Sequence, residues 1–106
     1  MYLFSKQEEL IMLSVFDLKD KATLSGIRKN LVQNAGKDWA IGSIYVALSR
    51  LIRNGYVRSQ FGEPTRERGG KAQKYFSLTT EGIEQLKETK KLQDNIWKNF
   101  SKIVPE

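Results

Sequence analysis

The sequence predicts a mainly α-helical fold with one small β-hairpin, and three observations support that class. Apolar residues recur at the three- and four-residue spacing of a helix in four separate stretches of the chain. Two short runs, residues 56–62 and 71–79, are instead rich in strand-forming residues, and a Pro- and Gly-containing segment joins them. The length of 106 residues, of which 40% are hydrophobic, suits a single domain with one modest core.

The first helix is expected to begin at Ser5 and to end at about Leu18. Ser5 and Glu8 have the spacing of a capping box, in which each side chain bonds the backbone amide of the other residue. The apolar residues that follow at helical spacing are Leu10, Ile11, Leu13, Val15, Phe16 and Leu18. This amphipathic pattern predicts a helix packed on the core.

A second, shorter helix is expected after the polar break at residues 19–22. Thr23 can cap it, and Gly36 stands where a left-handed residue commonly ends a helix. Its apolar side is formed by Leu24, Ile27 and Leu31. Residues 39–41, with Trp39 and Ile41, are then predicted to form a brief extended piece that enters the core.

The third helix is expected over residues 43–54, before Gly55. At about 100° per residue, one side carries the residues that should face the core: Ile44, Ala47, Leu48, Leu51 and Ile52. The opposite side and its flanks carry no acidic residue, and hold Tyr45, Val46, Ser49, Arg50 and Arg53. A solvated face usually mixes Glu with Lys, so this basic side is predicted to contact a partner.

A long last helix is expected from the cap residue Thr79 to about Ile103. Leu78 and Ile83 flank its start with the spacing of a hydrophobic staple. Its middle is almost entirely polar, but apolar residues share one side: Leu86, Ile96, Trp97, Phe100 and Ile103. The distal four extend past a compact domain of this size, so Ile96, Trp97, Phe100 and Ile103 are predicted to form a dimer interface.

The net charge of +6 is concentrated in the middle of the chain. Residues 37–77 contain eight basic and three acidic residues, which leaves +5 there, and this basic surface favours a polyanionic partner. The absence of His and Cys removes the commonest general base and metal ligands, so we expect no enzyme, metal or cofactor. With no apolar run of about 18 residues and no signal-peptide pattern, we expect a cytoplasmic protein without membrane contact.

A helix pair followed by a third helix and a two-stranded wing is the element order of the winged helix-turn-helix, to which a long C-terminal helix is added here. In that fold the third helix enters the major groove of DNA and the wing lies along the backbone or in the minor groove. Arg50 and Arg53 can bind guanine edges or phosphates, and Val46 can meet a thymine methyl. The predicted DNA-binding residues are Ser43, Tyr45, Val46, Ser49, Arg50 and Arg53 in the helix and Arg66, Arg68, Lys71 and Lys74 in the wing.

Two segments resemble the PadR-like transcriptional regulators. The segment IGSIYVALSRLIRNGYV (41–57) is similar to that family's Gly-x-Leu-Tyr-Pro-x-Leu-x-x-Leu-x-x-x-Gly helix, and GGKAQKYFSLTTEG (69–82) is similar to its wing and following helix start. In this sequence Val46 replaces the family's Pro, and Ile52 and Arg53 occupy positions where acidic residues are frequent. The resemblance implies that Tyr45 contacts DNA and that the protein is a homodimeric repressor of a palindromic operator.

Some members of that family bind flat aromatic or phenolic effectors, in certain cases between the C-terminal helices of the dimer. By position, Trp97 is the candidate for binding a small aromatic effector here. We divide the chain into a DNA-binding part, residues 1–78, and a dimerisation helix, residues 79–106, which form one continuous unit. The alternative function is a winged-helix interaction module that binds an acidic protein through its basic face or its last helix.

Overall fold

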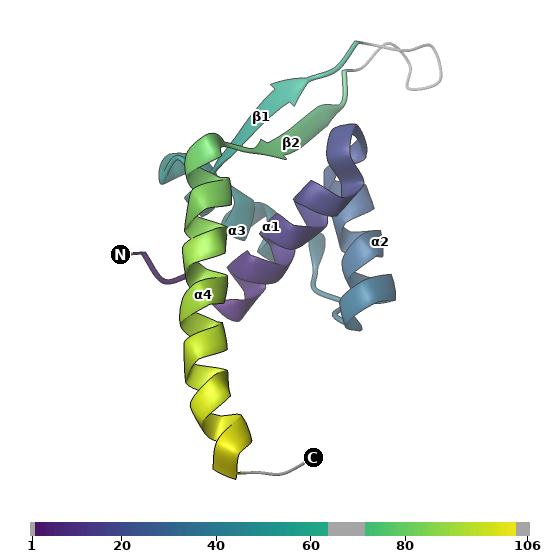
Figure 1. Ribbon diagram of the computed structural model, residues 1–106. Coiled ribbons are helices and arrows are strands. Elements are labelled where there is room, and N and C mark those ends of the chain that lie inside the picture. Colours follow the sequence, from purple (N-terminus) through teal and green to yellow (C-terminus); the bar gives the residue numbers. More distant parts are fainter. Residues whose placement is uncertain (1, 64–71, 104–106) are drawn as a thin grey trace.

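The computed structural model describes residues 2–63 and 72–103, and the mainly helical fold with a two-stranded wing is confirmed. The first half of the chain forms α1 (Lys6–Leu18), a short 3-10 turn η1 (Lys19–Lys21), α2 (Leu24–Ala35) and α3 (Ile41–Arg53). The second half forms β1 (Val57–Phe61), β2 (Lys74–Leu78) and α4 (Thr80–Ile103). In Figure 1 the hairpin lies at one end of the α1–α3 group, and α4 stands along its side.

The helix boundaries follow the capping residues in the sequence. Ser5 and Glu8 form the expected capping box, in which the Glu8 amide donates to Ser5 Oγ and the Ser5 amide donates to Glu8 Oε1. Thr23 Oγ1 accepts from the Gly26 amide at 3.1 Å, and Gly36 ends α2 in the left-handed conformation with φ of 63°. Thr79 Oγ1 accepts from the Gly82 amide at 3.0 Å at the start of α4.

The extended piece predicted for residues 39–41 is wrong. Ala40 is extended as the residue that precedes the helix, and α3 begins at Ile41 rather than at residue 43. Ile41 stands three and seven residues before Ile44 and Leu48, so its side chain continues the apolar side of the helix. Among the described residues the sheet has two strands and offers residues 39–41 no pairing partner.

The core lies where α1, α2 and α3 meet the base of the hairpin. The completely or almost completely buried apolar residues are Ile11, Met12, Val15, Ala22, Ile27, Leu31, Ile44, Ala47, Leu48, Leu51, Val57 and Phe76. Four of them form the inner side of α3, which confirms the core side expected for that helix, and Trp39 and Ile52 pack on the cluster partly buried. Burial of this surface from water is the main force that holds α3 in place.

The wing is an antiparallel pair in which Val57 lies opposite Leu78 and Phe61 opposite Lys74. Its base is fixed to the helices because Phe76 is buried and its amide donates to the Ala22 carbonyl at 2.9 Å. The other end of the hairpin, with Phe61 and Lys74, lies beyond this buried base, and Lys74 contacts Tyr45 of α3 there.

Helix α4 starts against the wing and its C-terminal half extends beyond the α1–α3 group (Figure 1). On that half Ile96, Trp97 and Phe100 are exposed, and the rings of Trp97 and Phe100 pack edge to face with centroids 5.3 Å apart. The side chain of Ile103 lies outside the described residues. In the part of the chain that the structure describes, every helix is too short or too polar to cross a membrane.

Candidate nucleic-acid interface

The outer side of α3 is defined by the four residues that point directly away from the core. Gly42, Val46, Ser49 and Arg53 lie within one sector at about 100° per residue, and the side chain of Val46 is 58% exposed. Arg53 is exposed in the last turn, whereas Ser49 is half-buried between them. An apolar contact, a hydroxyl and a guanidinium along one helix side form a set suited to base edges and phosphates.

Tyr45 connects this side of α3 to the wing. Tyr45 is 46% exposed, and the ammonium of Lys74 lies 5.6 Å from its ring centroid. The same ammonium lies 6.0 Å from the ring centroid of Phe61 and 5.8 Å from that of Phe76. Cation–π attraction therefore holds Lys74 at the junction of α3 and the wing, with its charge available to a phosphate.

Phe61 also belongs to this junction, although the sequence pattern did not predict it as a site residue. It is 69% exposed at the end of β1, directly opposite Lys74 in the register. Its place in a strand-forming run indicated a strand residue but not the exposure of its ring. An exposed aromatic ring beside a fixed cation is suited to contact a sugar or a base.

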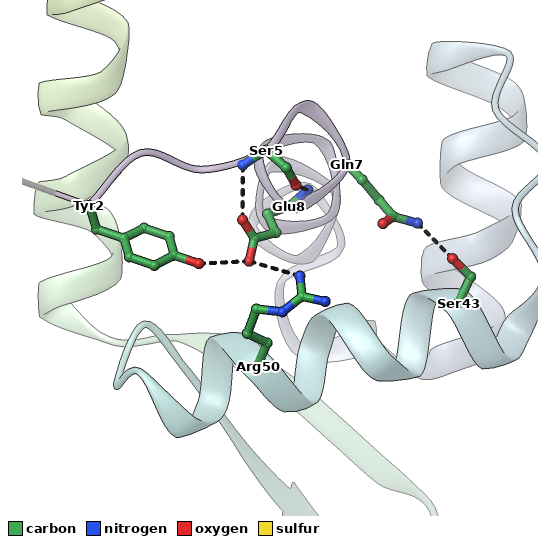
Figure 2. Close-up of polar contacts among 6 residues, drawn as sticks. All are labelled: Tyr2, Ser5, Gln7, Glu8, Ser43 and Arg50. Atoms are coloured by element: carbon green, nitrogen blue, oxygen red, sulfur yellow. Dashed lines mark hydrogen bonds and ion pairs between the residues drawn. The ribbon is translucent and has the colours of Figure 1, made fainter.

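Ser43 and Arg50 lie on the flank of α3 that faces α1 (Figure 2). Ser43 Oγ accepts a hydrogen bond of 2.9 Å from Gln7 Nε2. Arg50 Nη1 donates to Glu8 Oε2 at 3.3 Å and forms an ion pair with that carboxylate. Although α3 itself carries no acid, the fold therefore brings an acidic group from α1 against one of its arginines.

Glu8 is nearly buried, and its ionisation is set by three donors. Burial by itself would raise the pKa of the Glu8 carboxyl. Hydrogen bonds from the Ser5 amide, the Tyr2 hydroxyl and Arg50, together with the charge of Arg50, outweigh burial and lower that pKa below its ordinary value of 4.5. The pKa of the Tyr2 phenol is raised, first by burial and then by the Glu8 carboxylate. Glu8 is thus a carboxylate at neutral pH.

The remaining predicted wing residues, Arg66, Arg68 and Lys71, lie outside the described residues. Lys74 is the predicted wing contact that the structure places, and it lies next to Tyr45. The structure thus brings Tyr45 and Lys74 together, exposes Val46 and Arg53 along the outer side of α3, and sets Ser43 and Arg50 on the α1 flank. Within the described ranges no group of three or more acidic residues is close enough to hold a metal ion.

A second surface, an apolar groove, runs between α1 and α4. It is lined by Leu13 and Phe16 from α1 and by Leu78, Ile83 and Leu86, with Glu9, Lys87, Lys90, Gln93 and Asp94 at its margins. Leu13 and Phe16 are exposed, although the helical pattern of α1 indicated no more than an apolar side. Their exposure was not foreseen, because the pattern does not reveal that α4 leaves this part of α1 uncovered.

Three helices around one core, with a hairpin beside the third helix, define the chain as a winged helix-turn-helix. Residues 16–88 match the transcriptional regulator PadR-like family, which is 73 of the 106 residues. The chain belongs to that family. It is accordingly a DNA-binding transcription regulator and not an enzyme.

Solved structures share this fold. A PadR-like transcriptional regulator from Bacillus cereus strain ATCC 14579 is 19% identical, with a TM-score of 0.75 over 93% of this chain and 91% of that chain. A PadR-like transcription factor from Bacteroides fragilis is 27% identical, with a TM-score of 0.72 over 92% of this chain and 88% of that one. A PadR family regulator from Clostridium difficile R20291 is 23% identical, with a TM-score of 0.73 over 91% and 96% of the two chains. No curated protein sequence matches the chain.

Proposed function

We propose that the protein is a homodimeric repressor that binds a palindromic operator, with α3 in the major groove and the wing on the flanking backbone. The observation that carries this proposal is the exposed side of α3, which presents Val46 and, in the last turn, Arg53, together with Lys74 of the wing against Tyr45 of the same helix. These groups supply both kinds of DNA contact, since base edges confer specificity and phosphates confer affinity.

Individual roles follow from the position of each side chain. Arg53, exposed in the last turn of α3, reaches a guanine edge, and Val46 contacts a thymine methyl. Tyr45 and Ser49 donate to phosphate oxygens, and Lys74 neutralises a phosphate from its place among three aromatic rings. The three basic residues of the wing tip, Arg66, Arg68 and Lys71, add phosphate contacts.

Dimerisation is supported by two apolar surfaces that have no cover within the described chain. One is the distal stripe of α4 with Ile96, Trp97 and Phe100, and the other is the groove beside Leu13 and Phe16. In a dimer with two-fold symmetry, the stripe of each copy packs into the groove of the other, which buries both. The two α3 helices then reach half-sites about 34–36 Å apart, or a multiple of this distance.

A small aromatic effector is the further part of the proposal. Trp97 is 59% exposed and forms an edge-to-face pair with Phe100, so each copy contributes two rings to the α4 interface. A flat ligand between these rings gains stacking contacts that a single chain does not offer. Its binding would release DNA if it changed the separation of the two α3 helices.

The test is fluorescence anisotropy with labelled DNA from upstream of the protein's own gene, at several salt concentrations. We expect Arg53→Ala to weaken binding by about 1–3 kcal/mol, because one positioned guanidinium contact is lost. Lys91→Ala is the matched control, since Lys91 is exposed on α4 away from α3 and its removal changes the net charge equally. Equal affinity of Arg53→Ala and the parent protein would refute the role of this side of α3.

Light scattering on the same samples measures the oligomeric state. A dimer that shifts the DNA supports the proposal in full. A monomer that binds no DNA would instead favour the interaction module, in which the basic side of α3 contacts an acidic protein.

A further inference from the structure

The N-terminal segment and α1 form a hydrogen-bonded network under the flank of the DNA-binding helix (Figure 2). At its centre is Glu8, which is 3% exposed. Its Oε1 accepts from the Ser5 amide at 2.9 Å, and its Oε2 accepts from the Tyr2 hydroxyl at 2.9 Å and from Arg50 Nη1 at 3.3 Å. The network therefore joins the chain terminus to α3 through one carboxylate.

The two oxygens of Glu8 serve different structures. The capping box of α1 requires the bond between Oε1 and the Ser5 amide. Oε2 contributes nothing to that cap, and is directed at α3 and at Tyr2. If Glu8 served only as a capping residue, Oε2 could remain in water. Its burial against Arg50 therefore points to a second role.

Tyr2 is itself held from two sides, which fixes its hydroxyl on Glu8. Its carbonyl accepts from Gln85 Nε2 of α4 at 2.9 Å. Its ring packs against Phe4 and Tyr56, with centroids 5.2 and 5.3 Å away. The Glu8 carboxylate is thus held in one orientation by Ser5 and Tyr2. The Arg50 guanidinium that is bonded to it is restricted in turn.

Arg50 combines this anchor with access to solvent. Its side chain is 43% exposed, and the bond to Glu8 uses one nitrogen of a group that has five N–H donors. Arg50 lies three residues before Arg53, about 60° round the helix, so Arg53 points outward while Arg50 covers the edge of the same surface. An arginine that is already ordered loses less side-chain entropy when it binds a phosphate.

We propose that Glu8 is a positioning residue for DNA binding, which holds Arg50 with its remaining N–H groups toward a phosphate at the edge of the groove occupied by α3. This inference rests on the proposed function, because it requires α3 to face DNA. The negative charge of Glu8 opposes this role only weakly, since the ion pair with Arg50 at 3.3 Å sets a positive charge directly against it.

The experiment is a double-mutant cycle on operator affinity, measured by anisotropy with active protein counted by stoichiometric titration. Glu8→Gln preserves the shape of the side chain and the cap acceptor but removes the charge that holds Arg50. We expect it to weaken binding about 3- to 10-fold. In an Arg50→Ala background the same substitution is expected to have no further effect.

Two further variants separate positioning from mere stability. Tyr2→Phe keeps the carboxylate but removes the bond that orients it, and should weaken binding in the same direction, again only when Arg50 is present. Glu9→Gln removes the adjacent buried acid, which bonds Lys6 and Gln93 rather than α3, and should show no coupling to Arg50→Ala. Arg50→Ala should also reduce the slope of log affinity against log salt by about one unit.

The outcomes are distinct. If Glu8→Gln binds equally or more tightly than the parent protein, Glu8 either plays no part or masks Arg50, and the inference is overturned. If Arg50→Ala has no effect while Arg53→Ala weakens binding, the inference fails and the proposed function stands. If neither arginine matters, the proposed function fails as well.

Discussion

Substitution of Gly82 by Ala tests how α4 is attached to the DNA-binding part. Gly82 is buried in the first turn of α4, against the backbone of Tyr56 just before β1. A Cβ atom there would lie far inside contact distance of the Tyr56 carbonyl oxygen, 3.0 Å from its carbonyl carbon and 3.2 Å from Met12 Cε. Backbone atoms cannot rotate away as a flexible side chain can, so α4 itself must move.

The expected cost follows from that movement. Restoring ordinary carbon–oxygen and carbon–carbon contacts requires a shift of roughly 1 Å, and overpacking of this kind costs about 1–3 kcal/mol. The Tyr56 carbonyl also accepts from the Thr79 amide at 3.1 Å, and weakening this bond adds about 1 kcal/mol. We expect Gly82→Ala to lower the free energy of unfolding by about 2–4 kcal/mol.

The assay is urea unfolding at one fixed protein concentration, because association makes stability concentration-dependent. Gly42→Ala is the matched control, since Gly42 is also helical but a Cβ there meets nothing within 4 Å. The control should stabilise the protein by up to about 1 kcal/mol, the helix-propensity difference between Ala and Gly. A Gly82→Ala protein as stable as the parent would refute the packing argument.

Three further predictions concern the cap, the buried acid and the dimer. Thr79→Ala should lower the free energy of unfolding by about 1–2 kcal/mol in urea titrations, because the Gly82 amide loses its acceptor; Thr79→Ser should restore most of it. Because the pKa of Glu8 is lowered in the folded protein, its contribution to stability is present above 4.5 and is lost as pH falls through the folded-state value. Acid should therefore destabilise the parent more than Glu8→Gln, and parallel pH profiles of unfolding would contradict this. Trp97→Ala should weaken dimerisation by about 2 kcal/mol or more in sedimentation measurements, whereas Lys98→Ala, on the side of α4 opposite Ile96 and Phe100, should not.

Much of the fold was predictable because it depends on residues close together in sequence. Ser5, Thr23 and Thr79 each cap the helix expected of them, and the spacing of Ile44, Leu48 and Leu51 placed the core side of α3 correctly. The exposure of Val46 and Arg53 follows from the same helical period. These features require only the geometry of a few turns of helix, which is the same in any protein.

The start of α3 was mispredicted because the prediction relied on local helix-start signals alone. Gly42 and Ser43 suggested a helix start, but Ala40 precedes the helix without a side-chain cap. Ile41, the first residue of the helix, lies on the side that Ile44 and Leu48 continue and is half-buried there. Local capping preference is worth about 1 kcal/mol, and burial of an isoleucine can exceed it.

By itself, the sequence predicted four α-helices, a basic third helix and an apolar stripe on the distal half of the last helix, and the described residues contain these features. Only the tertiary structure decided that Arg50 is bound by Glu8, 42 residues away, and that Lys74 lies against Tyr45. The contrast has a physical reason. Periodicity specifies which side of an element is apolar, but the polar groups that meet across elements depend on how the helices and the hairpin pack, which the sequence pattern leaves open.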